Sequence, residues 1–253
     1  MGFIIFIIGL LIGSFLNVCI YRIPLGESIV YPSSHCTRCG TALKPLDLIP
    51  LLSFLVIKGR CKYCGEGISL RYPSVEFMNG LLYYLLYHQF GFTLELVAYG
   101  LLVSLLICIS LIDFDYQIIP DGLVLVGFAI GIFYKIINNL FQQAPFRISD
   151  SMGGLLLGGG LFLLIAIVSN GGMGGGDIKL MAMLGFWFGI KEILLVILLS
   201  FIIGAVVSVF LLLWKKKGGK DAIPFGPFIA SATFIALVSG DRIINWYMQW
   251  ILL

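Results

Sequence analysis

Long runs of uncharged, apolar residues divide this sequence, and they restrict its fold more than any other feature. A helix needs roughly 20 apolar residues to cross a bilayer, and within lipid a chain must satisfy its own backbone hydrogen bonds. Charged residues make up 11% of the chain and hydrophobic ones 60%, whereas about a quarter of the residues in a soluble domain are charged. We therefore expect an all-α, polytopic membrane helix bundle of about eight spans. The spans are expected near residues 3–21, 73–90, 95–112, 122–141, 151–169, 178–190, 193–214 and 223–239.

The positions of Lys and Arg predict the orientation of this bundle. If the N-terminus lies outside, 12 of the 16 basic residues fall in cytosolic segments and 4 in outer segments, as the positive-inside rule requires. The cytosolic set is Arg22, Arg38, Lys44, Lys58, Arg60, Lys62, Arg71, Lys179, Lys215, Lys216, Lys217 and Lys220, and the outer set is Lys135, Arg147, Lys191 and Arg242. We predict a multi-pass protein of the cytoplasmic membrane with its N-terminus outside and the lipid bilayer as a partner. The net charge of +3 is too small to indicate nucleic acid.

One large polar insertion interrupts the membrane pattern and suggests three parts. Residues 1–21 form a first membrane span, residues 22–72 a small cytosolic module, and residues 73–253 a membrane-embedded core. The module holds four of the six cysteines of the chain. The other two, Cys19 and Cys108, lie within apolar runs and are expected to be packing residues.

The four cysteines of the module have the spacing of a metal site. Cys36 and Cys39 form one CxxC pair, Cys61 and Cys64 form another, and a glycine follows each pair. Four thiolates at this spacing form a closed, structural zinc site, because no ligand position is left for water. Two disulfides or a redox pair are the alternatives, and a reducing cytosolic location argues against disulfides.

Aspartates at the ends of two apolar runs are the candidate catalytic residues. Asp113 ends the third predicted span, and Asp177 follows a run of glycines at the start of the sixth. Ionisable residues in membrane segments are costly and are functional candidates by default. Both aspartates are predicted at the cytosolic side, so their carboxyl groups can meet.

Two facing carboxyl groups can hydrolyse a peptide bond together. Because like charges repel, one group keeps a proton while the other is ionised. The ionised group takes a proton from water, which attacks the peptide carbonyl, and the protonated group donates to the carbonyl oxygen. The glycines before Asp177 allow a peptide to approach the backbone closely.

Other interpretations of these residues remain open at this point. The glycine-rich segment lacks the GK[ST] ending of a phosphate-binding P-loop. Asp121 follows Pro120 and is expected to cap a helix, while Asp115 is a ligand, a solvated neighbour or a support for Asp113. Asp113 and Asp177 could also form the ion site of an ion-coupled transporter, although we find none of the internal repeats typical of that class.

Four stretches of the chain, taken together, carry a family resemblance. They are residues 13–24 (GSFLNVCIYRIP), 71–76 (RYPSVE), 113–121 (DFDYQIIPD) and 174–179 (GGGDIK), with the paired CxxC insertion between the first two. In this combination the chain resembles the bacterial type IV prepilin peptidases, which are aspartic membrane proteases of the GxGD type. The resemblance extends over nearly the whole chain.

The resemblance implies a bifunctional enzyme. Its catalytic pair would be Asp113, which lies seven residues before Pro120 as the family pattern requires, and Asp177. The family cleaves the leader of prepilins and pseudopilins after a glycine at the cytosolic face. It then usually methylates the new N-terminus with S-adenosylmethionine.

The resemblance also points to candidate residues for the methyl transfer. They are Asn17, Arg22, Arg71 and Glu76, which otherwise serve as helix-end anchors and as an Arg–Glu pair. No separate methyltransferase domain is visible in the sequence, so these residues would build that site from the module and nearby helix ends. The rival interpretations are the ion-coupled transporter and a non-catalytic assembly platform that binds pilin helices through the zinc module.

Overall fold

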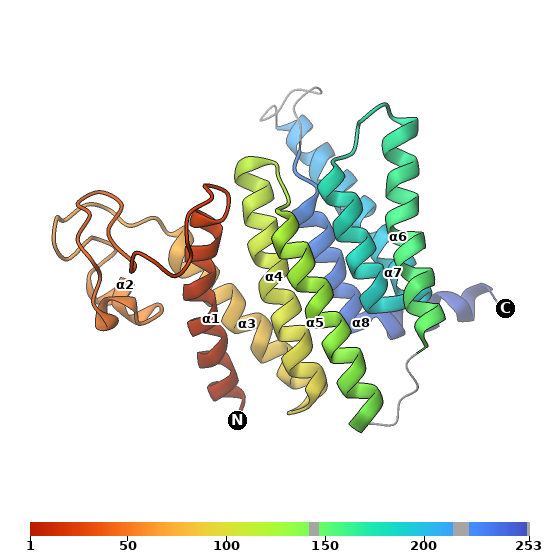
Figure 1. Cartoon of the computed structure of the whole chain (residues 1–253), viewed down its shortest axis with the longest axis horizontal. Helices are drawn as coiled ribbons and strands as arrows, with labels where there is room; N and C mark the ends of the chain where they lie inside the picture. The colour runs from red at the N-terminus through yellow and green to blue at the C-terminus, as the bar shows by residue number, and fades with distance from the viewer. Residues whose placement is uncertain (142–146, 215–222, 252–253) are drawn as a thin grey trace. The chain divides into compact units, whose positions relative to one another are not determined.

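The computed structural model describes residues 1–141, 147–214 and 223–251, and it is helical almost throughout (Figure 1). Two isolated bridges are the only β pairing within those ranges, so the predicted all-α class is confirmed. The elements are α1 (Gly2–Arg22), the 3-10 helix η1 (Pro45–Leu48), α2 (Leu52–Val56), α3 (Arg71–Phe90), α4 (Leu94–Tyr116), α5 (Asp121–Phe141), α6 (Ile148–Val168), α7 (Gly175–Leu213) and α8 (Gly226–Ile251). They form two compact units, Met1–Cys108 and Ile109–Leu253, and the division between them falls within α4.

Six helices of the described chain are long and apolar enough to cross a membrane: α1, α4, α5, α6, α7 and α8. The predicted number of spans was about eight, and two elements account for the difference. α3 has 20 residues and coincides with a predicted span, but it is not among the six. α7 has 39 residues and contains two predicted spans.

α7 reverses its direction at Gly189, so its two halves lie side by side rather than end to end (Figure 1). In a straight helix Met181 and Ile193 would be about 18 Å apart at 1.5 Å per residue. Yet a Cβ on Gly158 of α6 would lie 3.2 Å from the Cγ1 atom of Ile193 and close to the carbonyl of Met181. The first half of α7 is therefore antiparallel to α6 and the second half is parallel to it.

The reversal depends on a glycine and on a carboxylate from α6. Gly189 has φ 80° and ψ −174°, a conformation that only glycine adopts readily. Asp150 of α6 accepts a hydrogen bond from the N–H of Ile190 at 3.2 Å, at the start of the second half of α7. A Cβ on Gly189 would collide with this carboxylate.

Close glycine contacts also join α1 to α3 in the first unit. A Cβ on Gly9 would lie 2.8 Å from the Cα of Gly80, and one on Gly13 would lie 2.8 Å from the Cα of Glu76. Small residues allow helix backbones to approach each other in this way within a membrane. The fully buried Asn79 adds a polar link, since its Nδ2 donates to the carbonyl of Gly9 at 2.7 Å.

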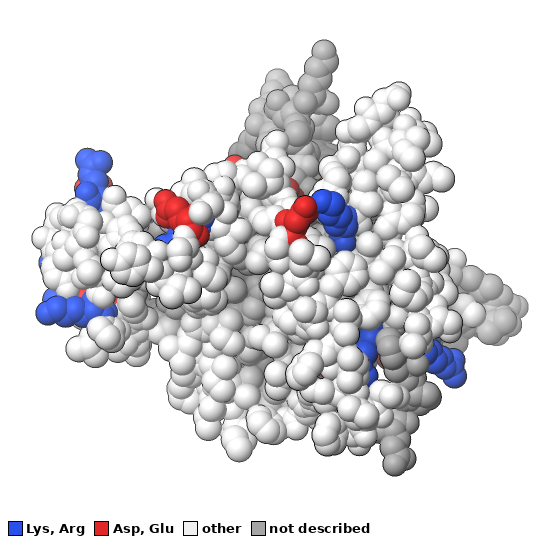
Figure 2. Space-filling view, in the orientation of Figure 1, with Lys and Arg blue, Asp and Glu red and all other residues white. Residues whose placement is uncertain are grey.

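The surface of the second unit matches a lipid environment. Figure 2 shows a few charged groups on a broad uncharged surface over its helices. The basic run at residues 215–220, which contributed to the predicted orientation, lies outside the described residues.

The reversal in α7 can be tested with paired glycine substitutions. Gly189→Ala is expected to lower the midpoint of thermal unfolding, because an unfavourable backbone conformation alone costs about 1–3 kcal/mol. Gly160→Ala on α6 is the control, since nothing lies within 4 Å of a Cβ at that position. Unfolding of the detergent-solubilised protein, followed by tryptophan fluorescence, measures both. Equal midpoints for the two variants would contradict the reversal.

Candidate functional site

Asp113 lies in the last turn of α4, and its carboxyl group is buried within the second unit. The residue is only 6% exposed. Its Oδ2 atom accepts a hydrogen bond of 2.8 Å from the backbone N–H of Gly226, the first residue of α8. α4 ends three residues later, and Gln117 then takes a left-handed conformation with φ 55°, as is common after a helix C-terminus.

Asp177 lies in the first turn of α7 and is half-buried. Its Oδ1 atom is buried and has no hydrogen-bond partner. Asp113 is near enough to act on this carboxyl group electrostatically, so the two predicted catalytic residues lie in the same part of the second unit. A buried carboxyl oxygen without a partner is rare and indicates a functional site.

The glycines before Asp177 leave room for their neighbours. A Cβ on Gly174 would lie 3.0 Å from Oδ2 of Asp177, and one on Gly176 would lie 2.7 Å from the Cβ of Ile119. Nothing lies within 4 Å of a Cβ on Gly175. The GxGD pattern therefore has a physical basis, because its two outer glycines are in tight places and its middle position is open.

The other aspartates of the 113–121 stretch are in different surroundings from Asp113. Asp115 is exposed. Asp121 is also exposed, and both of its carboxylate oxygens accept hydrogen bonds from Nζ of Lys179, at 2.8 and 2.9 Å. This pair joins the start of α5 to the first turn of α7, close in sequence to Asp177. Asp121 was expected to cap its helix, which stays a prediction, and the contact given for its carboxylate is this ion pair with α7.

The four cysteines of the module form a single cluster. The Sγ atoms of Cys36, Cys39, Cys61 and Cys64 all lie within 4.8 Å of one another. The Sγ atoms of Cys36 and Cys64 are 3.9 Å apart, near the value of about 3.8 Å that follows from tetrahedral zinc with 2.3 Å bonds. A disulfide needs about 2.05 Å, and all four thiols are free. The donor set and its spacing therefore fit zinc.

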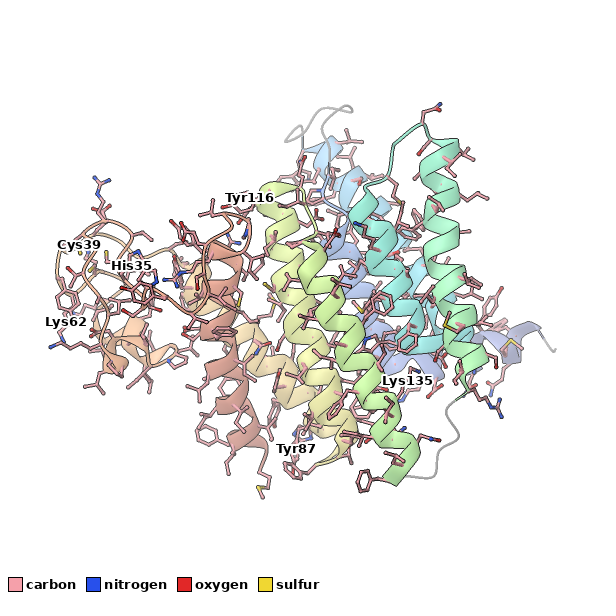
Figure 3. All side chains as sticks on the ribbon, viewed as in Figure 1. His35, Cys39, Lys62, Tyr87, Tyr116 and Lys135 are labelled. Atoms are coloured by element: carbon pink, nitrogen blue, oxygen red, sulfur yellow. The ribbon has the colours of Figure 1, made fainter. Side chains whose placement is uncertain are left out.

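The backbone adopts the same conformation and forms the same hydrogen bond at both CxxC pairs. The N–H of Gly40 donates to the carbonyl of Cys36, and that of Gly65 to Cys61, each at 2.8 Å. Both glycines have positive φ, 70° and 75°, a conformation that glycine allows. Figure 3 shows Cys39 and Lys62 in this module, together with His35.

The thiols of the cluster differ in their pKa. Hydrogen bonds with Thr41 lower the pKa of Cys39 to about 6. The backbone N–H of Glu66 favours the thiolate of Cys64, yet burial and the neighbouring thiols raise the pKa of Cys64 to about 12. Four thiolates repel one another at this separation, and a divalent cation such as zinc would neutralise that repulsion.

Three of the four residues assigned to methyl transfer bind backbone groups around the module. Asn17 donates to the carbonyl of Tyr72 at 3.1 Å, and Arg22 donates to the carbonyls of Ser28 and Ser33 at 2.9 and 3.4 Å. The buried Glu76 accepts from the N–H of Leu51 at 2.9 Å. 

The fourth residue, Arg71, opens α3. Arg22 and Glu76 therefore attach the module to α1 and α3, and Asn17 joins α1 to α3.

Two cavities with shared walls lie next to these attachments. Their volumes are about 270 and about 310 Å³, near the lower end of the range for small-molecule sites, roughly 300–1,000 Å³. Asn17 and Arg22 line the first cavity, and cysteines of the cluster line the second. The residues common to both are His35, Thr37, Leu43 and Tyr72.

One contributor to the site was not predicted from the sequence, namely the backbone N–H of Gly226. It reaches Asp113 from 113 residues further along the chain. The sequence feature that could have indicated this contributor is the segment Pro-Phe-Gly-Pro at 224–227, which directly precedes an apolar run.

The fold and site define a polytopic membrane protein with a pair of buried carboxyl groups and a four-cysteine module. A model of the type IV leader peptidase family matches residues 100–209, and one of the bacterial peptidase A24 N-terminal domain matches residues 7–90. The chain belongs to this family, as the sequence predicted. No solved structure shows significant similarity to it.

Curated relatives agree with the family models. A protein of Bacillus subtilis named prepilin leader peptidase/N-methyltransferase is 38% identical over 250 residues, covering 97% of each chain. A relative of the same name from Pseudomonas aeruginosa is 38% identical over 267 residues, covering 96% of this chain and 92% of its own. A third, from Myxococcus xanthus, is 39% identical over 220 residues, 85% of this chain and 64% of the relative.

The metal site can be tested by metal analysis. The purified protein is expected to hold about one zinc per chain, because four cysteine thiolates make a closed tetrahedral site. Cys36→Ser and Cys61→Ser should lose most of it. Cys19→Ser and Cys108→Ser are the controls, since these two buried cysteines lie outside the cluster. A wild-type protein without zinc, purified in the absence of chelators, would contradict the assignment.

Proposed function

We propose that this chain cleaves the leader peptide of type IV prepilins or pseudopilins and then N-methylates the new N-terminus. Membership of the leader peptidase family and the names of the relatives support both activities. The observation that carries the peptidase mechanism is the meeting of Asp113 and Asp177 at one buried site. Nothing in the comparisons favours an ion-coupled transporter.

In the proposed cleavage step, Asp113 and Asp177 share one proton. The ionised carboxylate removes a proton from a water molecule, whose oxygen attacks the carbonyl carbon of the scissile peptide bond. The protonated carboxyl group donates its proton to the carbonyl oxygen. The tetrahedral intermediate then collapses, the C–N bond breaks, and the departing nitrogen takes up a proton. The products are a leader with a new carboxylate and a pilin with a free amine.

The position of the pair fits a substrate that arrives from the cytosol. The end of α4 and the first residues of α5, α7 and α8 supply the groups of the site, namely Asp113, Asp121, Asp177 and Gly226. Lys179, which donates to Asp121, lies at the same end of the unit. We place this end of the unit at the cytosolic face and the N-terminus of α1 outside, following the distribution of basic residues. The partners are prepilin or pseudopilin helices within the bilayer.

We place methyl transfer in the first unit, at the two cavities beside the cysteine cluster. S-adenosylmethionine supplies an activated methyl group, and the free amine of the cleaved pilin is its acceptor. Asn17 and Arg22 line one cavity and hold its walls through their bonds to backbone carbonyls. Glu76 holds the segment at Leu51. Their proposed contribution is to shape the donor site, and zinc would hold the module around it.

The proposed dyad predicts the effect of four substitutions on cleavage. Asp113→Asn and Asp177→Asn should each lower the rate by about a thousandfold or more, within the range that acid–base groups contribute. Asp115→Asn and Asp121→Asn should retain some activity, because both residues are exposed and neither belongs to the proposed dyad. Product masses from a prepilin substrate measure the rate. Normal cleavage by Asp113→Asn, together with loss in Asp115→Asn, would contradict the assignment of the first aspartate.

The two activities are expected to be separable, because their residues lie in different compact units. The Asp177→Asn protein should still methylate a pre-cleaved pilin peptide, seen as the mass of one added methyl group. Glu76→Gln and Arg22→Gln should lower methylation at least tenfold more than cleavage, since they loosen the module. No methylation by a folded, zinc-loaded Asp177→Asn protein would mean that the dyad also serves methyl transfer, or that the chain is a peptidase only.

A further inference from the structure

We infer that the backbone N–H of Gly226 is a positioning group for Asp113, and that the N-terminus of α8 forms part of the catalytic site. This inference rests on the proposed peptidase function and goes beyond it, because it adds a residue to the catalytic site. Gly226 would act by holding one carboxyl oxygen of Asp113, so that the other oxygen faces the reacting groups.

The hydrogen bond itself is the first observation. The N–H of Gly226 lies 2.8 Å from Oδ2 of Asp113, and the bond is buried. Asp113 lies in the last turn of its helix, where helix geometry limits the side chain to a few rotamers but does not by itself fix the carboxyl group. Because residues 224 and 227 are prolines, which have no N–H, only Phe225 and Gly226 offer backbone donors within the segment 224–227. The helix N-terminus adds a favourable dipole for a carboxylate.

The side-chain space at residue 226 is the second observation. A Cβ there would lie 2.8 Å from Oδ2 of Asp113 and 3.2 Å from both its Cβ and its Cγ. Gly226 is absent from the glycines with positive φ among the described residues, so its backbone conformation is open to any residue. Glycine is therefore required here for the close approach to Asp113 and not for its own flexibility.

An aromatic cluster keeps Gly226 in place. The ring of the preceding Phe225 packs on Phe162 of α6 at 6.0 Å, on Phe201 of α7 at 5.4 Å and on Phe228 of α8 at 5.9 Å, measured between ring centroids. Phe162 is fully buried. Residue 225 is thus anchored against α6, α7 and α8, and the amide that follows it is held relative to these helices.

Asp177 has a similar arrangement, which explains how the two carboxyl groups are aimed. Its Oδ2 atom is near Gly174, the residue that precedes α7, while its buried Oδ1 atom has no partner. In each aspartate, then, Oδ2 lies against a glycine at the start of a helix. The Oδ1 atom of Asp177 is the one left for water and substrate.

The test is the cleavage kinetics of the full-length Gly226→Ala protein with prepilin in detergent or nanodiscs. Displacing a catalytic group by about 1 Å can lower the rate by about 100-fold, so kcat should fall by about that factor while KM stays within about threefold. Gly240→Ala in the same helix is the matched control, because the nearest atom to its Cβ, Cδ2 of Leu195, is at an ordinary 3.6 Å. Methylation of a pre-cleaved peptide should be unchanged in both variants.

A thermal-unfolding cycle separates positioning from general damage. If the added methyl group acts by pressing on the carboxyl group of Asp113, Gly226→Ala should lower the unfolding midpoint in the wild type but much less in an Asp113→Ala background. An equal loss in both backgrounds, or a wild-type kcat in Gly226→Ala, would overturn the inference while leaving the proposed function intact. If the wild-type protein itself fails to cleave prepilin, it is the proposed function that fails.

Discussion

Placing two carboxyl groups together inside a membrane protein is the constraint on which the rest of this structure depends. Each group loses hydration, and the two repel each other when both are charged. Asp113 and Asp177 have therefore to be held by rigid neighbours. The structure supplies a backbone amide from Gly226, the close approach of Gly174, and an ion pair between Asp121 and Lys179 beside them. Most of these groups come from the first turns of helices.

Glycine makes this arrangement possible in several places, for two different reasons. At Gly189 the chain needs a backbone conformation that other residues avoid, and the resulting reversal lets both halves of α7 pack on α6. At Gly154, Gly185 and Gly226 the requirement is space, because a Cβ would meet a neighbouring backbone or carboxyl group. Backbone packing at glycines thus helps to position the carboxyl group of Asp113.

Local patterns of the sequence predicted the helices, the cysteine cluster and the candidate aspartates. Apolar runs determine membrane helices, and the CxxC spacing determines a metal cluster, because both depend on residues close together in the chain. Asp113 is buried and Asp115 is exposed, while the assignment of Asp113 as the first catalytic aspartate stays a prediction. The reversal near residue 190 follows from two consecutive predicted spans, 178–190 and 193–214, with Lys191 between them. The contact of Gly189 with Asp150 and the bond from Gly226 were beyond prediction, since each joins residues that are distant in the sequence. The three-part division of the chain stays a prediction.

The residues assigned to methyl transfer show a similar limit. These residues were selected because they are polar groups at helix ends within family motifs. The side chains of three of them, Asn17, Arg22 and Glu76, form hydrogen bonds with backbone groups. A motif alone does not distinguish a side chain that contacts a ligand from one that holds the walls of its cavity. Here the hydrogen bonds favour the second role, and the cavities beside them indicate where a donor would fit.

The central claim is that Asp113 and Asp177 act as a single catalytic unit. The most direct test is the single-turnover cleavage rate of Asp113→Asn, of Asp177→Asn and of the double variant, measured by mass spectrometry over long incubations. Residues that act as a unit give non-additive losses, so the double variant should be no slower than either single one. A double variant slowed by the product of the two single losses would contradict the account, as would substantial activity in either single variant.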